Sequence, residues 1–381
     1  MHVMFIPSWY NNKRNPVHGS FFKEQADAIQ ESGVKVTVAY NEIWPLTQLF
    51  KVNEKIGISY SLEDKLRTYR YKNFNYLPKN PKMFSVFNKR LEKLYKEIVK
   101  KEGKVDLIHC QSSFWAGISA AYIAKKYNIP LVITEHSSLK TAMYIKESYK
   151  PFIKKSYLDA DALIAVGNGL KKEMIEFSGR RDIKVIHNLI PVEKFNINKN
   201  KNNVVTFFSL AFLEGEKGMD VLLKAFSNYF KSTNTRLIIG GDGSQKDYLI
   251  NLSRELNIDK QVDFLGALSR EEVFSYMSKC DVFVLASKYE TFGVVYIEAL
   301  ASGKPIIGTY NGGAEDIINK NNGLLVKVND IDELGNAMNN IINNLGSYNP
   351  EAIRKECIEK YSKKKIISEI LNVYDELLKE R

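Results

Sequence analysis

The chain has 381 residues, of which 44% are hydrophobic and 26% are charged, a composition that excludes disordered and fibrous proteins. This length is enough for two domains of medium size. The three cysteines, Cys110, Cys280 and Cys357, are odd in number and far apart, which argues against a disulfide framework or a structural zinc site and favours a reducing cytoplasm.

The charge is unevenly distributed along the chain. Residues 1–200 hold 33 Lys and Arg against 19 Asp and Glu, a net +14, whereas residues 201–381 hold 22 against 25, or −3, which together give +11. The excess is densest over residues 65–104, with 13 basic and three acidic residues interleaved with aromatic ones. Such a patch favours an anionic partner. Because no nucleic-acid-binding motif accompanies it, we expect no nucleic acid and keep an anionic membrane surface as the candidate.

The first half of the chain predicts alternating strands and helices. We expect a strand at residues 2–6, a helix over 21–32 and a second strand over 34–39, and this start lacks the pattern of a signal peptide. Further strands are predicted at 106–109, 130–134 and 162–166, with a helix over 115–127. Strands separated by helices predict a parallel sheet covered on both faces.

Within the basic segment, apolar residues recur at helical spacing: Phe84, Phe87, Leu91, Leu94 and Ile98. This stripe faces either the protein core or a bilayer interface. Apolar periodicity alone does not separate these two interpretations, and both stay open at this point.

The polar, low-complexity run over residues 196–203 is the best candidate for a linker between domains. It predicts a first domain over residues 1–195 and a second over 204–360, where strands and helices alternate again. The fold class is therefore α/β, with two Rossmann-like domains.

The most informative segment follows the apolar run 281–286, which is typical of a strand buried in a parallel sheet. A polar loop with Glu290 and Gly293 comes next, and helical spacing begins at Val294. Ligands of such sheets bind beyond the carboxyl ends of strands, and a helix amino terminus suits a phosphate. Glu298, one turn inside the helix, is placed to accept hydrogen bonds from sugar hydroxyls. Taken singly, Glu290 is interpreted as an ordinary helix-start glutamate and Glu298 as an exposed helix residue, but the combination predicts a nucleotide sugar.

The spacing from Glu290 to Glu298 resembles the E-x7-E element of retaining, nucleotide-sugar-dependent glycosyltransferases of the GT4 family, which have the two-domain GT-B fold. The resemblance covers essentially the whole chain and is most specific over residues 204–328. It includes the segments 217–226, 239–243, 264–266 and 311–316. It implies that the two domains face each other across a cleft, that the first binds the acceptor and the second the donor, and that a last helix, about 363–381, packs back on the first domain.

The resemblance also assigns roles to residues of the second domain. It places Glu290 on the donor sugar, with the amides of Phe292 and Gly293 nearby, and Glu298 on the ribose hydroxyls. It assigns binding of the donor diphosphate to Lys217 and to the amides of Val294 and Val295. Two further donor-binding positions are Gly241 and Leu265. Relatives often carry an arginine before this lysine, but the run 209–216 has none, so Lys217 and backbone donors are expected to bind the phosphates.

In the first domain, residues 7–10 and 15–25 resemble the amino-terminal motif of bacterial surface-polysaccharide members of the family. By this resemblance Gly19 begins the helix that approaches the donor pyrophosphate. A glycine there is ordinarily a turn residue, and without a full GxGxxG motif a dinucleotide site is disfavoured. His136 follows a predicted strand and is assigned to the transferring sugar or a phosphate oxygen, whereas His109, at a similar strand end, carries less weight.

Of two DxD spellings, the one at residues 159–161 precedes a predicted buried strand and the one at 330–332 lies in a predicted loop before a helix. We therefore interpret both as structural and expect no metal. The expected activity is retaining, metal-independent transfer from a nucleotide-diphosphate sugar, of which UDP-sugars are the commoner kind. The expected acceptor is a glycan or lipid-linked molecule in surface polysaccharide or glycoconjugate synthesis. The expected location is the cytoplasm or the inner membrane face.

Two alternatives stay open: a nucleotide-sugar epimerase of the same fold and a non-catalytic sugar-nucleotide-binding partner. The presence of Glu290, Glu298 and Lys217 favours an enzyme. A retaining glycosidase is disfavoured, because its carboxyl groups lie about 5–5.5 Å apart, whereas eight helical residues span about 12 Å.

Overall fold

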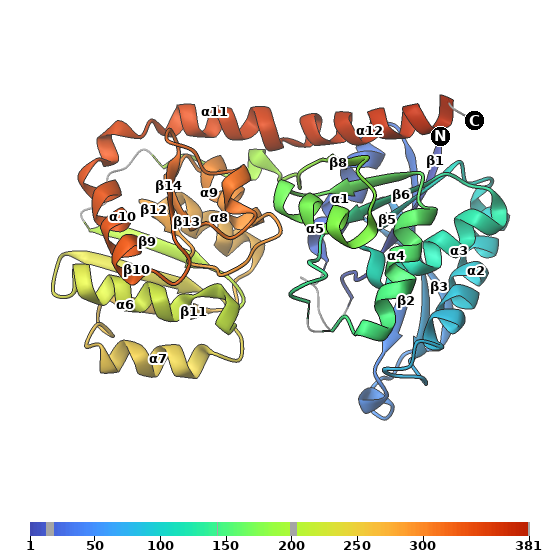
Figure 1. Cartoon of the computed structure of the whole chain (residues 1–381), viewed down its shortest axis with the longest axis horizontal. Helices are drawn as coiled ribbons and strands as arrows, with labels where there is room; N and C mark the ends of the chain where they lie inside the picture. The colour runs from blue at the N-terminus through green and yellow to red at the C-terminus, as the bar shows by residue number, and fades with distance from the viewer. Residues whose placement is uncertain (13–18, 143, 199–203, 380–381) are drawn as a thin grey trace. The chain divides into compact units, whose positions relative to one another are not determined.

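The computed structural model describes residues 1–12, 19–142, 144–198 and 204–379, which fold into two compact α/β units (Figure 1). The first unit comprises Met1–Leu189 and the carboxyl-terminal segment from Ile366 onward, and the second comprises Ile190–Lys365. The second unit thus begins before the predicted linker, because Ile190 and Phe195 are buried within it. Residues 199–203 of that linker lie outside the described residues.

The first unit contains an eight-stranded sheet in the order β3-β4-β2-β1-β5-β6-β7-β8. Its strands are β1 (His2–Pro7), β2 (Lys35–Trp44), β3 (Gly57–Glu63), β4 (Leu66–Phe74), β5 (Leu107–Gln111), β6 (Leu131–Glu135), β7 (Ala162–Ala165) and β8 (Ile183–Val185). All neighbours pair in parallel except β3, which lies antiparallel to β4 at the sheet edge. Asp64 and Lys65, both with positive φ, form the two-residue hairpin turn that reverses the chain here.

The helices of the first unit cover this sheet, and the last of them is built into its core. They are α1 (Ser20–Glu31), α2 (Met83–Glu102), α3 (Ile118–Tyr127), α4 (Lys150–Asp159), α5 (Asn168–Ser178) and, from Ile366 onward, α12 (Lys363–Lys379). Ile370 and Tyr374 of α12 are buried in one cluster with Val3 and Phe5 of β1. The carboxyl-terminal helix is therefore part of the first unit.

The apolar stripe of α2 faces the core. Phe84, Phe87, Leu91, Leu94 and Ile98 are all buried, and the helix packs on α3, β2 and β4. The core-facing interpretation is confirmed and the bilayer-facing one is wrong for these five residues, because the sheet and α3 already cover them. Among the helices in the described part of the chain, none is long and apolar enough to cross a membrane.

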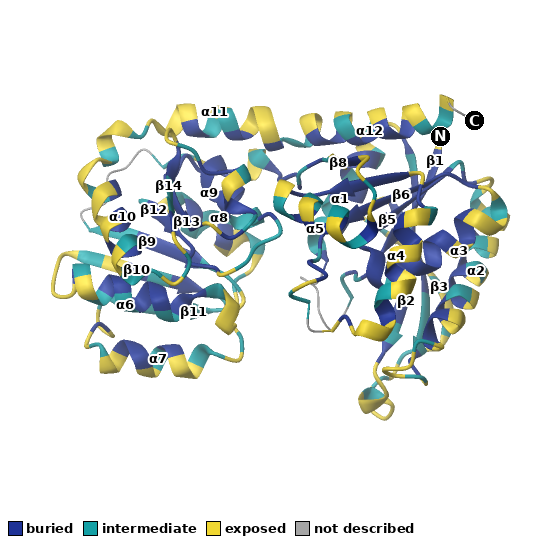
Figure 2. Cartoon of the chain, in the orientation of Figure 1, coloured by how far each residue is buried: buried dark blue, intermediate teal, exposed yellow. Residues whose placement is uncertain are grey.

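The second unit is built on a six-stranded parallel sheet in the order β11-β10-β9-β12-β13-β14. Its strands are β9 (Val205–Leu210), β10 (Thr235–Gly240), β11 (Val262–Gly266), β12 (Val282–Val284), β13 (Ile306–Thr309) and β14 (Gly323–Val326). Its helices are α6 (Met219–Phe230), α7 (Lys246–Glu255), α8 (Arg270–Lys279), α9 (Val294–Ala301), α10 (Ile331–Asn343) and α11 (Pro350–Tyr361). Strands β12 and β13 are buried along their whole length, while the helices expose their outer faces (Figure 2).

The strand order of the second unit reverses between β9 and β12. From β9 the chain moves to β10 and β11 on one side, and from β12 to β13 and β14 on the other. The loops that follow β9 and β12 therefore separate at a topological switch point, where ligands of open α/β sheets bind. This is where Lys217 and Glu290 lie.

Candidate functional site

The loops after β9 and β12 pack directly against each other. Gly218 has a φ of 63°, and a Cβ atom at this position would lie 2.1 Å from the carbonyl oxygen of Ala286. The amide of Lys288 donates a hydrogen bond of 2.8 Å to the carbonyl of Glu216. Only glycine permits both this φ and so close an approach to the Ala286 carbonyl. The packed loops therefore fix the backbone position of the neighbouring Lys217.

Lys217 and Glu290 form an ion pair at this junction. The Lys217 Nζ lies 2.7 Å from Glu290 Oε1, and Ser287 Oγ donates to the same oxygen at 2.8 Å. The two charged side chains are 24% and 14% exposed, so both are held in place yet reachable by a ligand. The structure thus brings together the two second-unit residues that the sequence assigned to chemistry.

Asn311, which follows β13, braces the loop that carries Glu290. Its carbonyl accepts from the Glu290 amide at 3.0 Å, and its buried Oδ1 accepts from the amides of Gly313 and Ala314 at 3.1 and 2.9 Å. The resemblance included the segment 311–316, but the role of Asn311 was not predicted. An asparagine before two glycines is a turn signal, yet its partner lies 21 positions away.

Helix α9 begins with an open amino terminus. Gly293 precedes it with a φ of 93°, where a Cβ atom would lie 2.5 Å from the Tyr296 ring, and no side chain caps the first turn. The adjacent Phe292 is buried against Tyr361. Val294 and Val295 are the first residues of the helix, so their amides lie where a helix offers unpaired donors and positive potential to an anion.

Glu298 is fully buried and paired with Arg270. The Arg270 Nη1 donates to Glu298 Oε1 at 2.5 Å, and 1% of the glutamate side chain is exposed. Burial raises the pKa of Glu298 above its ordinary value, and the arginine opposes this rise. The interpretation of Glu298 as an exposed helix residue is therefore wrong.

Arg270 was not found from the sequence. The capping box of Ser269 and Glu272 marks the helix start that it occupies, at the carboxyl end of β11. Arg270 pairs with Glu298, 28 positions later, because of how α8 and α9 pack. Sequence spacing does not predict this packing. The structure thus places a guanidinium beside Glu298, in a unit whose segment 209–216 lacks arginine.

Gly241 directly follows β10, and Leu265 lies near the carboxyl end of the neighbouring strand β11. At Gly241, with a φ of 124°, a Cβ atom would lie 1.8 Å from the carbonyl oxygen of Ala211. The Gly241 amide donates to the carbonyl of Gly266 at 2.7 Å, next to the half-buried Leu265. The glycine is therefore required for loop packing, whatever else it contacts.

In the first unit, Gly19 starts α1 without a side-chain cap. Its φ is 73°, and a Cβ atom there would lie 2.6 Å from the carbonyl oxygen of Trp9, so the helix start is packed against the loop after β1. Residues 15–18 of the amino-terminal motif lie outside the described residues.

His136 is buried at the carboxyl end of β6 within a chain of polar contacts. Its Nε2 lies 2.7 Å from Gln111 Oε1, the Gln111 Nε2 lies 3.0 Å from His109 Nε2, and the His109 Nδ1 lies 2.6 Å from the Tyr374 hydroxyl. Each of these hydrogen bonds has one donor and one acceptor when His136 carries its proton on Nε2. The buried Nδ1 of His136 then is an acceptor for which the structure shows no hydrogen-bond partner.

Burial lowers the pKa of His136 to about 3, with a smaller contribution from the nearby His109, so the ring is neutral near pH 7. His109 links α12 to the sheet, which agrees with the lesser functional weight given to it. The neighbouring Glu135 shapes the His136 loop, because its carboxylate accepts from the amides of Ser113, His136 and Ser137.

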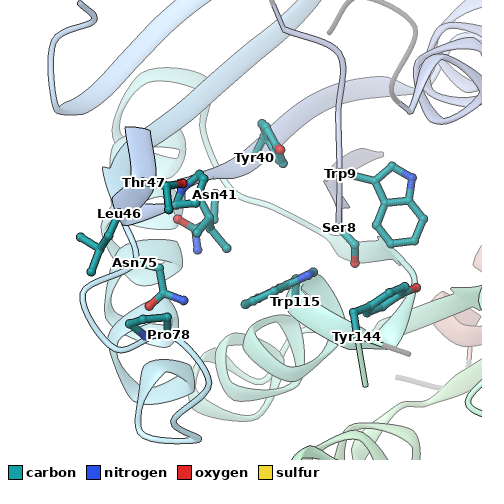
Figure 3. Close-up of a pocket in the computed structure, with 12 residues that line it drawn as sticks. Ser8, Trp9, Tyr40, Asn41, Leu46, Thr47, Asn75, Pro78, Trp115 and Tyr144 are labelled. Atoms are coloured by element: carbon teal, nitrogen blue, oxygen red, sulfur yellow. The ribbon is translucent and has the colours of Figure 1, made fainter. Parts of the chain in front are cut away.

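The first unit also contains a pocket of about 610 Å³ that was not predicted (Figure 3). Its walls include Trp9, Tyr40, Trp115 and Tyr144, from four segments distant in sequence. Trp115 has φ 70° and ψ −70°, a strained conformation for a residue other than glycine. Aromatic walls with a few polar groups suit a ligand with apolar faces.

Three of the four aspartates of the two DxD spellings have structural partners. Asp159 pairs with Lys155, Asp161 accepts from the amide of Leu131, and Asp330 caps α10. Within the ranges that the structure describes, no group of three His, Cys, Asp or Glu residues could hold a metal. Metal independence stays a prediction.

The Arg270–Glu298 pair predicts a pH-dependent effect of Arg270→Met. Without the guanidinium the pKa of Glu298 rises further, so the folded state binds the proton more tightly than the unfolded state, and stability falls as pH rises above 4.5. We expect a loss of about 1–3 kcal/mol in unfolding free energy at pH 8 and a smaller loss at pH 5, measured by urea unfolding.

The matched control is Arg236→Met, which breaks the more exposed pair with Asp263 in the same unit. This variant should lose less than about 1 kcal/mol. Equal losses for Arg270→Met at pH 5 and pH 8 would contradict this account of Glu298.

His136 predicts acid sensitivity of the first unit. Its folded pKa of about 3 lies below the ordinary 6.5, so the stability that it contributes is present above pH 6.5 and is lost as pH falls toward 3. Between pH 7 and pH 5 this loss amounts to about 2 kcal/mol. His136→Gln should lose that much less than wild type in urea unfolding over this range, whereas Ser137→Ala should follow wild type. A His136→Gln variant as acid-sensitive as wild type would refute the prediction.

Both halves of the chain match glycosyltransferase family models. Residues 19–194 match the model described as Glycosyltransferase Family 4, and residues 191–364 match the model described as Glycosyl transferases group 1. The two matches together span both units.

Individual relatives are also described as glycosyltransferases. An uncharacterized glycosyltransferase of Methanocaldococcus jannaschii is 33% identical over 295 residues, 75% of this chain and 79% of the relative. The putative teichuronic acid biosynthesis glycosyltransferase of Bacillus subtilis is 26% identical over 356 residues, 89% of this chain and 88% of the relative. The crystal structure of Anabaena HepE in complex with UDP has a TM-score of 0.78 at 19% identity, covering 99% of this chain and 100% of that one, and shows the same GT-B fold. The chain belongs to glycosyltransferase family 4.

Proposed function

We propose that the protein is a retaining, metal-independent glycosyltransferase that uses a nucleotide-diphosphate sugar, with UDP as the expected nucleotide. The acceptor is a hydroxyl of a glycan or lipid-linked molecule in surface polysaccharide or glycoconjugate synthesis. The observation that carries this proposal is the Lys217–Glu290 pair at the switch point, beside the uncapped start of α9. The UDP complex of the Anabaena structure supports the nucleotide, and the name of the Bacillus subtilis relative supports the glycan class.

The positive charge for the reaction comes from the chain itself. The bond between the anomeric carbon and the diphosphate oxygen breaks, and a bond from the acceptor oxygen forms on the same face of the sugar. The acceptor proton passes to the leaving diphosphate. Lys217 and the amides of Val294 and Val295 face growing negative charge on that diphosphate, so they stabilise the transition state more than the bound donor.

The two glutamates position the donor through hydroxyl groups. Glu290 Oε1 is held by Lys217 and Ser287, which orients the carboxylate so that it accepts hydrogen bonds from the donor sugar. Glu298 is held by Arg270 and accepts from the ribose hydroxyls. Arg270 thereby acts as a positioning residue. Carboxylates repel phosphate, whereas Lys217 attracts it. The separate positions of the two glutamates and Lys217 therefore also orient the nucleotide.

In the first unit, His136 and Gly19 are the proposed contacts to the donor. The neutral His136 ring offers its unpartnered Nδ1 as an acceptor, which suits a sugar hydroxyl and not a phosphate oxygen. The uncapped start of α1 after Gly19 suits the pyrophosphate. The aromatic pocket bounded by Trp9 and Trp115 is the proposed acceptor site.

The test is incubation with UDP-sugars, with and without an acceptor glycan, followed by NMR of the products. We expect sugar transfer with the donor's anomeric configuration retained. Glu290→Gln should lower kcat by about 100-fold or more, because its carboxylate contacts are made to the reacting sugar. Glu216→Gln, which changes the same charge on the exposed residue beside Lys217, should keep wild-type kcat.

Three outcomes would overturn the proposal. An inverted product would contradict retention. Isomerised sugar nucleotide without transfer would indicate an epimerase, and nucleotide binding without turnover of any tested sugar would indicate a binding subunit.

A further inference from the structure

The connection between β2 and β3 exposes an unusual set of apolar side chains. Leu46, Leu49, Phe50 and Ile56 are all exposed, and Phe50 is 98% exposed, the largest fraction among the large hydrophobic residues that the structure describes. Figure 1 shows this blue loop at the lower end of the first unit, and Figure 2 shows its exposure. Single exposed hydrophobic residues are ordinary, but four within 11 positions mark an interaction surface.

The exposed apolar surface continues along β3. Ile58, Tyr60 and Leu62 alternate along this edge strand and are all exposed. The Tyr60 ring lies 4.9 Å from the ring of Tyr69, whose hydroxyl donates to Glu102 at the end of α2. These side chains therefore lie on the face of the sheet that carries the basic helix α2. An uncovered apolar edge strand is an aggregation hazard unless something binds to it. We call residues 46–62 the apolar edge.

The net charge within the apolar edge is positive. Lys51 and Lys55 are exposed within it, whereas Glu54, its one acidic residue, lies 2.5 Å from Lys72. A second copy of this chain would bring like charges together across such a surface. An anionic bilayer is complementary to it, because apolar side chains enter the interface while lysines bind lipid phosphates.

The apolar edge is continuous with the wall of the aromatic pocket. Leu46 and Thr47 line that pocket opposite Trp9 and Tyr144 (Figure 3), and Phe50 follows a few residues later. A bilayer that receives Phe50 therefore lies against the rim of the pocket. An acceptor in the pocket can then keep a lipid chain in the same membrane.

We propose that the apolar edge, with Lys51 and Lys55, binds an anionic bilayer and presents a lipid-anchored acceptor to the pocket. The second half of this proposal rests on the proposed glycosyltransferase function, whereas the first half requires no turnover. Membrane contact then depends on this edge and not on the buried stripe of α2.

The experiment is co-sedimentation of the full chain with vesicles of phosphatidylcholine alone and of phosphatidylcholine with phosphatidylglycerol at three to one. We expect binding to the anionic vesicles that weakens as salt is raised. Leu49→Ser combined with Phe50→Ser should weaken it about tenfold or more, because two apolar side chains no longer enter the interface. Lys51→Glu combined with Lys55→Glu should weaken it to a similar degree.

Matched controls separate the edge from general surface changes. Leu158→Ser replaces a leucine of α4 that is 55% exposed, in the same unit, and should bind like wild type. Lys260→Glu combined with Lys320→Glu reverses two exposed charges of the second unit and should also bind like wild type. Circular dichroism verifies that each variant is folded.

The proposal is overturned if wild type does not bind anionic vesicles, or if the control variants lose as much binding as the edge variants. It is also overturned if the edge variants abolish a lipid-free dimer in sedimentation velocity, since a second copy would then cover the edge. Vesicle binding with no sugar transfer would refute the proposed function and the lipid-anchored acceptor but leave the membrane contact standing.

Discussion

The site in the second unit depends on one close contact, between Gly218 and the carbonyl of Ala286. Because the loops after β9 and β12 meet here without an intervening side chain, Lys217 lies within ion-pair distance of Glu290 although 73 positions separate them. Asn311 then fixes the Glu290 backbone from the loop after β13. Three strand ends thus combine to place one cation, one carboxylate and one open helix terminus side by side.

Burial determines how the polar groups around these sites behave. Glu298 is buried with a single cation, so its pKa is raised and its orientation is fixed by Arg270. His136 and His109 are buried without a carboxylate partner among their ring contacts, so they stay neutral and act through directed hydrogen bonds. The same property makes the unpartnered Nδ1 of His136 a group that gains from binding a hydroxyl.

Local patterns predicted much of this molecule, and long-range pairings account for the rest. The apolar run before the Glu290 loop and the glycine at position 293 were enough to place β12 and α9. Arg270 was missed because it meets Glu298 only through helix packing. The stripe of α2 was ambiguous because a core and a bilayer demand the same periodicity. The aromatic pocket was missed because its walls come from segments that are distant in sequence.

The most direct test of the account is calorimetric titration with UDP and with uridine, extended to GDP and ADP with their nucleosides. If Lys217 binds the diphosphate, Lys217→Ala should weaken nucleotide binding by about 10- to 100-fold and leave nucleoside binding unchanged. Lys224→Ala, on the surface of α6, should bind both like wild type. Undiminished nucleotide binding by Lys217→Ala would contradict the claim that the switch point of the second unit holds the donor diphosphate.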